Sequence, residues 1–364
     1  MRKKKVIVLN RSYGATVGGS INVTDAIIKI LSERVHKIET TACVFGSIDI
    51  QSENDINYVR VRIPYLRSIA SKYKGVLSNF LNRIDDLMVS ILILPRLLFY
   101  RYIIHTGSII QIILPALFTK KYFLINIPGP ISRMDIALYK MLGGLGCKIS
   151  FFGVGVCLDG IPRYNSFKFY RANPVRYPPD FANDLRRKRH HFLSLTSTLP
   201  LRVITVGRNT SVKRLKCIYS VLEAITEFPI EWTIVANDSI NLIQNISGIH
   251  KVSFMEDLPN NEVAKLYAQS HIYISLSSFE SYGWATVEAM QVGLPIIATG
   301  SGYPAQIPSV YFCRNIANLH VDKIIDIAKS LEAIYKNNVY ECEFTGSTKT
   351  LTKVIQEVVD EFIS

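Results

Sequence analysis

Few of the signals that set a chain apart from ordinary globular proteins occur in this sequence of 364 residues. Its six cysteines include no Cys-x-x-Cys pair and no Cys-His metal spacing, which excludes an evident zinc domain and indicates reduced thiols in a cytoplasmic protein. The Gly-x-Gly-x-x-Gly fingerprint and the Walker-type Gly-x-x-x-x-Gly-Lys-Ser/Thr motif are also missing. These absences count against nicotinamide-dependent enzymes and P-loop NTPases.

Long hydrophobic runs are scarce as well. The start, MRKKKVIVLN, has an apolar stretch of about five residues, which is too short for a signal peptide. Residues 87–125 are very apolar, but Arg96 and Arg101 interrupt them, and a spanning helix needs about 20 mostly apolar residues. We expect a buried strand–helix unit here, with a segment that dips into a membrane as the alternative.

The composition is that of a folded chain, with 48% hydrophobic and 20% charged residues, and the length suggests about two domains. The net charge of +13 is uneven, because residues 1–180 carry +14 and residues 181–364 carry −1. A basic first half suggests an anionic partner such as phosphate, acidic lipid or nucleic acid. A solvated basic surface is the alternative.

Strand-like and helix-like segments alternate in the first half. A β-rich run at 5–10 is followed by a Gly-containing loop and by residues 21–33, whose apolar positions suit a helix packed on a sheet. Further strand-like runs lie at 39–45, 58–63, 103–106, 121–126 and 148–154. Continuous apolar strands alternating with helices predict an α/β fold, with a mainly parallel sheet covered on both faces.

The alternation breaks between about 157 and 200, where prolines and a charged run mark a boundary, and then restarts. Strand-like runs follow at 201–206, 231–236, 251–255, 271–276 and 294–298. We predict a Rossmann-like domain over 1–180, a linker over 181–199, a second such domain over 200–345, and a terminal helix, 346–364, packed back on the first domain. Two parallel-sheet domains of this kind bind ligands in the central cleft that they face, at the carboxyl ends of the strands.

The first candidate site follows the strand-like run 201–206 and reads Gly207-Arg-Asn-Thr-Ser-Val-Lys213. Gly207 permits a tight turn, and Arg208 and Lys213 put two cations at the carboxyl end of a strand. The following helix N-terminus adds free N–H groups and the positive end of the helix dipole. This arrangement suits a diphosphate, and the alternative is a solvated loop with two surface cations.

A second candidate site is the segment Glu280-Ser-Tyr-Gly-Trp-Ala-Thr-Val-Glu288. If a helix begins near Trp284, both carboxylates can face one ligand near its N-terminus, and Gly283 allows close approach of the backbone. Two uncoupled surface glutamates are the alternative. The apolar segments on either side count against it, because they predict buried strands around the pair.

The loop before the first helix, Gly14-Ala-Thr-Val-Gly-Gly-Ser20, is a third and weaker candidate. Two adjacent glycines, Gly18 and Gly19, suit a backbone cradle for phosphate at a helix N-terminus. An ordinary strand-to-helix turn is the alternative.

Together these segments resemble a known family. VGRNTSVKRL (206–215), the stretch 257–299 with its Glu-x7-Glu pair, and VRYPPD (175–180) are similar to the retaining glycosyltransferases of family 4, which have the GT-B fold. The specific likeness covers roughly residues 200–300. It implies two Rossmann-like domains facing a central cleft and an enzyme that uses a nucleotide-sugar donor.

The resemblance implies a role for each matching residue. Arg208 and Lys213 would bind the donor diphosphate and neutralise the leaving group, Glu280 would hold the transferred sugar near its reacting carbon, and Glu288 would bond the ribose hydroxyls. We therefore take Glu280, Arg208 and Lys213 as catalytic. Further donor contacts are implied for Gly18, Gly19, Ser20, Tyr282, Gly283, Trp284, Ala285, Phe254 and Leu258.

Three departures from the family pattern stand out. The stretch 300–306 lacks the acid that is usual after the second motif, which puts donor-sugar contacts there in doubt. The segment 126–130 lacks a histidine, so His105 is the nearest candidate on the acceptor side, and a structural histidine is the alternative. The glycine usual after the strand at 251–255 is replaced around Glu256, which puts base contacts in doubt.

We accordingly expect a hexosyltransferase-type enzyme that moves a sugar from a UDP-, GDP- or ADP-linked donor to an acceptor with retention of configuration. No metal motif is visible, so we expect no metal and no cofactor beyond the nucleotide-sugar substrate. The apolar stretch 87–125 and nearby cations predict a peripheral site on the inner face of a membrane, with a lipid-linked or membrane-proximal acceptor. These cations include Lys72, Lys74, Arg83, Arg96 and Arg101.

Two other classes of function stay open. One is a nucleotide-sugar epimerase or hydrolase on the same fold, and the other is a non-catalytic module that binds anionic surfaces. Nucleic acid is not expected as a partner, because no nucleic-acid-binding motif accompanies the charge, and DNA glycosylation is the extreme alternative.

Overall fold

The computed structural model consists of two compact units. Unit 1 is Met1–Ala172 together with Leu351–Ser364, and unit 2 is Asn173–Thr350. The structure describes residues 3–10, 19–34, 38–45, 56–61, 69, 76–119, 121–127, 131–154, 158–172, 175–195, 200–207, 210–236, 250–256, 258–278, 280, 282–299, 313–314, 328–329, 331 and 349–364.

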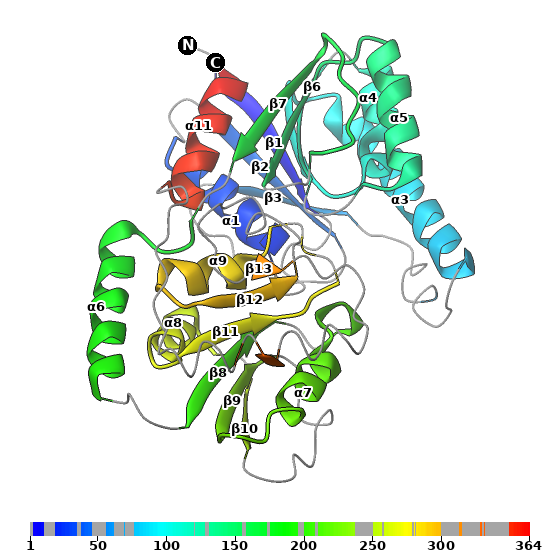
Figure 1. Cartoon of the computed structure of the whole chain (residues 1–364). Helices are drawn as coiled ribbons and strands as arrows, with labels where there is room; N and C mark the ends of the chain where they lie inside the picture. Colours follow the sequence, from blue (N-terminus) through cyan, green and yellow to red (C-terminus); the bar gives the residue numbers. More distant parts are fainter. Residues whose placement is uncertain are drawn as a thin grey trace. The chain divides into compact units, whose positions relative to one another are not determined.

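Unit 1 is built on a parallel sheet whose strand order among the described residues is β3-β2-β1-β4-β5-β6-β7 (Figure 1). The strands are β1 (Lys4–Asn10), β2 (Ile38–Phe45), β3 (Asn57–Val61), β4 (Tyr102–Thr106), β5 (Tyr122–Ile127), β6 (Ile149–Val154) and β7 (Phe167–Ala172). All five residues of β4 are buried, as a central strand covered on both faces requires. The predicted α/β fold class is confirmed.

Helices cover both faces of this sheet. From β1 the chain crosses through α1 (Gly19–Ser32) to β2, whereas from β4 it crosses in the opposite direction through η1 (Ile109–Ile112) and α4 (Ile113–Phe118) to β5. Because such crossovers are right-handed, the two sets of helices lie on opposite faces (Figure 1). The remaining described helices of unit 1 are α3 (Val76–Leu97), α5 (Arg133–Gly144) and α11 (Leu351–Ile363).

The last helix, α11, completes unit 1 although it follows unit 2 in the chain. It packs against α1, and its buried positions are Leu351, Val354, Ile355, Val358, Val359, Phe362 and Ile363. Arg34 pairs with Asp360, and Lys4 donates to the carbonyl of Ile363. Unit 1 is therefore assembled from the two ends of the sequence.

The sheet of unit 2 is also parallel, with the order β10-β9-β8-β11-β12-β13 among the described residues. Its strands are β8 (Leu201–Val206), β9 (Ile230–Val235), β10 (Lys251–Met255), β11 (Ile272–Ser275), β12 (Ile296–Thr299) and β13 (Cys313–Arg314). The described helices are α6 (Pro179–Leu195), η2 (Ser211–Lys213), α7 (Leu215–Glu223), α8 (Asn260–Ala268) and α9 (Trp284–Gln291).

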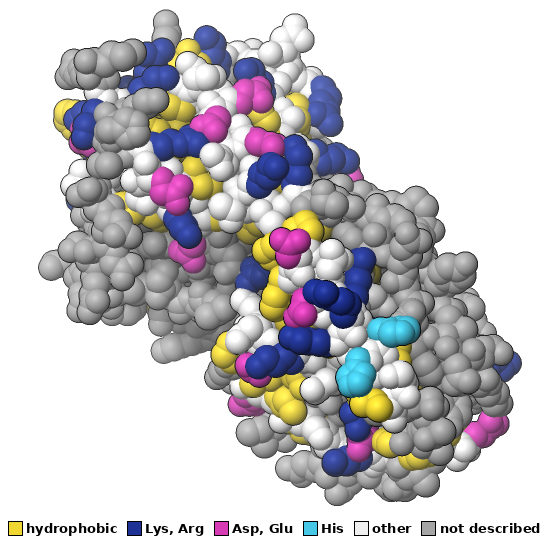
Figure 2. All heavy atoms as spheres, turned by 90° about the vertical axis from the view of Figure 1, so that its left-hand side faces the viewer, with side chains coloured by type: hydrophobic (Ala, Val, Ile, Leu, Met, Phe, Trp, Pro, Cys, Tyr) yellow, Lys and Arg dark blue, Asp and Glu magenta, His cyan; other side chains and the backbone are white. Residues whose placement is uncertain are grey.

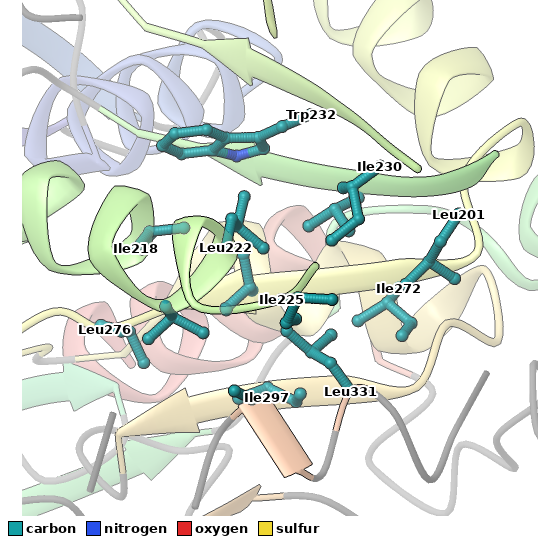
Figure 3. Packing of buried hydrophobic residues seen from close by; sticks show 14 of the residues in the cluster. Leu201, Ile218, Leu222, Ile225, Ile230, Trp232, Ile272, Leu276, Ile297 and Leu331 are labelled. Atoms are coloured by element: carbon teal, nitrogen blue, oxygen red, sulfur yellow. The ribbon is translucent and has the colours of Figure 1, made fainter. Parts of the chain in front are cut away.

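An apolar cluster between α7 and the sheet forms the core of unit 2 (Figure 3). Ile218 and Leu222 of α7 face Ile272 and Leu276 from β11 and the residue after it, and all four side chains are less than about 2% exposed. The one polar group of Trp232 is satisfied, since its indole Nε1 donates to Thr205 Oγ1 at 3.0 Å. This packing fixes the carboxyl ends of β8 and β11, where the candidate site lies.

The segment predicted as a linker, 181–199, is largely helical, so that prediction is wrong. Helix α6 covers Pro179–Leu195 within unit 2, and its inward positions are Ala182, Leu185 and Arg189. The buried Arg189 donates to the carbonyls of Ser270 and His271. The charged run 186–191 obscures the helical pattern in the sequence, because Arg189 occupies a position in the core. Strand β7 is also not predicted by the sequence pattern.

The other side of α6 is exposed and basic. Figure 2 turns this side of the molecule toward the viewer and shows Lys and Arg side chains gathered around histidines. A pocket of about 570 Å³ lies here, lined by Arg186, Arg187, Arg189, His190, His191, Ser194, Val292 and Gly293. It includes no candidate site residue, so we do not take it as the donor site.

The apolar stretch 87–125 is buried only in part. Strand β4 and helix η1 are buried as expected, but α3, the residues just after it and α4 leave several large apolar side chains exposed, among them Phe99 and Phe118. No helix in the described part of the chain is both long enough and apolar enough to cross a bilayer.

Candidate active site

Two candidate residues of unit 2, Lys213 and Glu280, lie together at the switch point of its sheet. Strands β9 and β10 lie on one side of β8, and strands β11 and β12 lie on its other side. The chain therefore leaves β8 toward one edge of the sheet and leaves β11 toward the opposite edge. Ligands of open parallel sheets bind at the carboxyl ends of the strands at such a point. The two loops are joined here, because Ser278 N donates to Val212 O at 2.8 Å.

Lys213 and Glu280 form an ion pair at this edge, from Lys213 Nζ to Glu280 Oε1. Lys213 ends η2 after β8, and Glu280 lies in the loop after β11. Their side chains are 23% and 18% exposed, so the pair is mostly shielded yet remains open to solvent. Two residues that are 67 positions apart in sequence thus present a cation and a carboxylate at one place.

The Lys213 side chain lies over Gly207. A Cβ atom on Gly207 would come within 3.1 Å of Lys213 Cε, which is tighter than ordinary contacts. Glycine at the end of β8 therefore leaves room for the lysine stem. Arg208, the other predicted cation, lies outside the described residues.

Arg214, which follows Lys213, was not singled out in the sequence. It adopts the left-handed conformation with φ of 50°, where non-glycine residues are strained, and it separates η2 from α7. Backbone strain of this kind concentrates at functional sites. No pattern in the sequence marks it, because arginine gives no hint of a left-handed turn.

Helix α9 begins where the second motif predicted. Gly283 precedes it with φ of 83°, a conformation that glycine adopts without steric cost. The buried ring of Tyr282 packs edge-on against the ring of Trp284, with 4.5 Å between the ring centroids, and this contact stabilises the turn before α9. The side chain of Ala285 is partly exposed, and its carbonyl accepts a hydrogen bond from the Tyr267 hydroxyl at 3.1 Å.

Glu288 lies one turn into α9 and is almost completely buried. Its Oε2 accepts a 3.5 Å hydrogen bond from Tyr267, and its Oε1 lies 3.9 Å from Arg176 Nε. Burial raises the pKa of the Glu288 carboxyl to about 7, although Arg176 and the Tyr267 hydrogen bond act in the opposite direction. A carboxyl of this kind changes charge near neutral pH.

Glu280 and Glu288 both act on Tyr273 of β11. Burial raises the pKa of the Tyr273 hydroxyl, and the two carboxylates raise it further. The hydroxyl therefore stays protonated over the working pH range. This shared neighbour supports the prediction that the two carboxylates face a common region.

Gln291 fixes the segment that carries Arg176. Its Oε1 accepts from the backbone N–H groups of Arg176 and Tyr177 at 3.0 and 3.1 Å, and its Nε2 donates to Tyr177 O at 2.9 Å. A buried glutamine thus ties residues 176–177 to α9, one turn after Glu288. The sequence gives no signal for Arg176, Tyr267 and Gln291, because the partners of their polar groups are brought close only by the tertiary fold.

The remaining predicted donor residues of unit 2 lie at the end of β10. Phe254 is half-buried and packs against the core cluster, and Leu258 is half-buried just before α8. Because the sheet is parallel, β10 ends at the same edge as β8, and Phe254 and Leu258 therefore lie at that edge.

In unit 1 the candidates lie near the switch point between β1 and β4. Gly18 is outside the described residues, and Gly19 and Ser20 begin α1. His105 of β4 is buried, and its Nε2 lies 3.0 Å from Ser108 O. Burial lowers the pKa of His105 to about 4, so the ring is neutral at pH 7. Gly107 leaves room for this ring, because a Cβ there would lie 3.3 Å from it.

No group of three or more His, Cys, Asp or Glu side chains among the described residues is arranged to hold a metal ion.

Known structures resemble the fold of this chain. Sucrose-phosphate synthase from Thermosynechococcus elongatus superposes with a TM-score of 0.64 at 14% identity, covering 99% of this chain and 95% of that chain. Trehalose-6-phosphate synthase OtsA gives 0.64 at 10% identity, with 100% and 99% covered. Anabaena HepE, in complex with UDP and glucose, gives 0.57 at 12% identity, with 100% of each chain covered. These likenesses establish the GT-B fold.

The two parallel sheets of this topology place the chain among proteins with the GT-B fold. More particularly, residues 188–345 of unit 2 match the family model described as "Glycosyl transferases group 1". The resemblance seen in the sequence is confirmed at this level, and family 4 remains a prediction. No curated protein sequence matches the chain.

Proposed function

We propose that this enzyme transfers a sugar from a nucleotide-diphospho-sugar to an acceptor hydroxyl with retention of configuration. The observation that carries the proposal is the Lys213–Glu280 ion pair at the switch point of unit 2, with the buried Glu288 in the helix that follows the same loop. A cation at the end of β8 suits a diphosphate. A partly open carboxylate suits sugar hydroxyls, and a buried one suits a ribose.

The reaction needs charge stabilisation more than proton transfer by the protein. The bond between the anomeric carbon and the donor phosphate oxygen breaks as the acceptor oxygen bonds to the same face of that carbon. The proton of the acceptor hydroxyl passes to the leaving phosphate oxygen. Lys213, Arg208 and the N–H groups at the start of α9 would stabilise the negative charge that develops on the diphosphate.

Titration with UDP-, GDP- and ADP-sugars tests the donor. Thermal shift and slow donor hydrolysis should single out one nucleotide, since mass action stabilises the folded enzyme only for a ligand that it binds. Product analysis with and without acceptor separates transfer from hydrolysis and epimerisation. If no nucleotide-sugar shifts the melting temperature, the donor class is contradicted.

Glu280 and Glu288 should fail differently when each is replaced by glutamine. Glu280→Gln should mainly lower kcat, because we assign Glu280 to the sugar at the reacting carbon, where interactions strengthen in the transition state. Glu288→Gln should mainly weaken donor binding, because a ribose contact exists before and during reaction. Steady-state kinetics in donor concentration measures both, and equal defects in kcat and KM would contradict the division of roles.

We propose that the acceptor is lipid-linked or membrane-proximal. Unit 1 supports this through its apolar 87–125 region and through basic side chains around it. Of the cations named from the sequence, Lys72 and Lys74 lie outside the described residues. Arg83 is already engaged by Ser108, Ser132 and Asp135, so it does not serve a lipid surface.

A further inference from the structure

Helix α3 of unit 1 turns an apolar face outward. Its inward face buries Asp85, Asp86 and Ser90 beside apolar residues such as Val89, whereas its outward face carries large exposed apolar side chains. The exposed residues of this face are Leu77, Phe80, Leu87, Ile91 and Leu92, followed by Leu98 and Phe99 just past the helix end. A soluble surface helix normally presents the opposite pattern.

The inward polar groups hold α3 in this orientation. Gln111 Nε2 donates to Asp86 Oδ1 at 2.8 Å, and Leu114 N donates to Ser90 Oγ at 3.1 Å. Arg83 adds bonds to Ser108 and Ser132, each at 3.2 Å. Rolling the helix to bury its apolar face would break these bonds and expose Val89 and Ile93, which are buried. The apolar face is therefore built to point outward.

Helix α4 extends the same surface. It packs against α3 and ends in the exposed Leu117 and Phe118. Lys121 Nζ donates to Leu98 O at 3.1 Å, which joins the start of β5 to the end of α3. We call this continuous region, formed by α3, residues 98–99 and the end of α4, the α3–α4 surface. Figure 1 shows α3 and α4 as neighbours in unit 1.

The charge of this region has one sign. From Leu87 to Met134 the sequence contains no Asp or Glu, but it contains Arg96, Arg101, Lys120, Lys121 and Arg133. Arg101 lies over the rings of Tyr102 and Tyr122 at 5.7 and 5.5 Å, which places its guanidinium at the start of β4. Exposed apolar groups flanked by cations without acids match the chemistry of an anionic bilayer interface.

We infer that the α3–α4 surface docks on an anionic lipid bilayer, with its apolar side chains in the headgroup region and its cations on lipid phosphates. A second copy of the chain fits less well, because a symmetric pairing would bring like charges of this face together. The inference deepens the membrane-proximal acceptor proposed above. Vesicle binding and donor binding are measured in separate experiments. A negative result for the membrane surface therefore leaves the proposed nucleotide-sugar donor untouched, and the reverse also holds.

Co-sedimentation with phosphatidylcholine vesicles, with and without phosphatidylglycerol, tests the inference. Phe99 and Phe118 are 76% and 72% exposed, so replacing both with serine removes the apolar anchors without disturbing the core. Leu195→Ser is the matched control, because Leu195 is 71% exposed at the end of α6 in unit 2. Arg96→Gln with Lys121→Gln removes charge alone.

The wild-type chain should bind anionic vesicles at low salt and bind neutral ones more weakly. Phe99→Ser with Phe118→Ser should lower partitioning by about tenfold or more, and each removed cation by about fivefold, while Leu195→Ser stays at the wild-type level. Donor thermal shifts should be unchanged in all these variants, which shows that they are folded.

Three results would overturn the inference. The first is no binding of the wild-type chain to anionic vesicles at low salt, and the second is unchanged binding of the Phe99→Ser and Phe118→Ser variant. The third is a concentration-dependent dimer that this variant converts to a monomer without any vesicle binding. That result would assign the α3–α4 surface to a second copy of the chain.

Discussion

Glu288→Gln should make the enzyme more stable above pH 7 while it weakens donor binding. Because burial raises the pKa of Glu288 to about 7, the folded protein keeps a proton between pH 4.5 and 7 that the unfolded chain releases. The stability that this proton confers is fully present below pH 4.5 and is lost as the pH rises through 7. Glutamine does not ionise, so the variant should gain roughly 3 kcal/mol of stability at pH 8 and less than about 1 kcal/mol at pH 5.

Thermal melts at pH 5 and pH 8 measure this difference, and calorimetric titration with the donor measures binding. If the ribose prefers the ionised carboxylate, wild-type donor affinity should rise with pH through about 7, and Glu288→Gln should abolish the rise. At pH 8 the donor affinity of Glu288→Gln should be about 10- to 150-fold below that of the wild type, the range expected for the loss of a charged hydrogen bond. Glu262→Gln, an exposed change on α8 with the same change of formal charge, is the control. A variant that is less stable than wild type at pH 8 would contradict the assignment.

Removing both predicted phosphate cations should nearly abolish donor use. We expect Arg208→Ala and Lys213→Ala each to weaken donor binding by about 10- to 150-fold, the effect of one charge-assisted contact, and the double variant to lose more than either. Lys213→Ala also leaves the half-buried Glu280 without its ion-pair partner, which adds repulsion toward an anionic donor.

The control for this series is Lys216→Ala, which removes an exposed lysine three residues further on, in α7. Circular dichroism melts should show that all variants fold, since neither Lys213 nor Lys216 belongs to the buried core. Wild-type donor affinity in the double variant would contradict a diphosphate site at the end of β8.

The sequence predicted those parts of the site that lie in single contiguous segments. Glu280 and Glu288 were identifiable because Gly283, Trp284 and the flanking apolar strands fix a loop and a helix start within a few residues. Arg176 and Gln291 were not, because their partners lie more than 100 positions away and the buried amide bonds only backbone groups. Hydrophobic periodicity carries no signal for such contacts.

The two misread segments have a common physical cause. In α6 a buried Arg189 stands where an apolar residue would complete the helical pattern, so the sequence pattern predicts a linker and not a helix. In α3 the apolar residues were expected in the core, because periodicity reports that one face differs from the other and not which face meets water. Only the bonds of Asp86 and Ser90 reveal which face points inward.

The discontinuous make-up of unit 1 sets an order of events during synthesis. Its first 172 residues leave the ribosome before unit 2, but α11, which covers α1, is made only after Thr350. At 5–20 residues per second, translation of the intervening unit takes on the order of ten to forty seconds. During that interval the side of α1 that packs against α11 is not covered by that helix. The nascent chain should therefore depend on chaperones at this stage, whereas unit 2 can complete its own core as soon as it emerges.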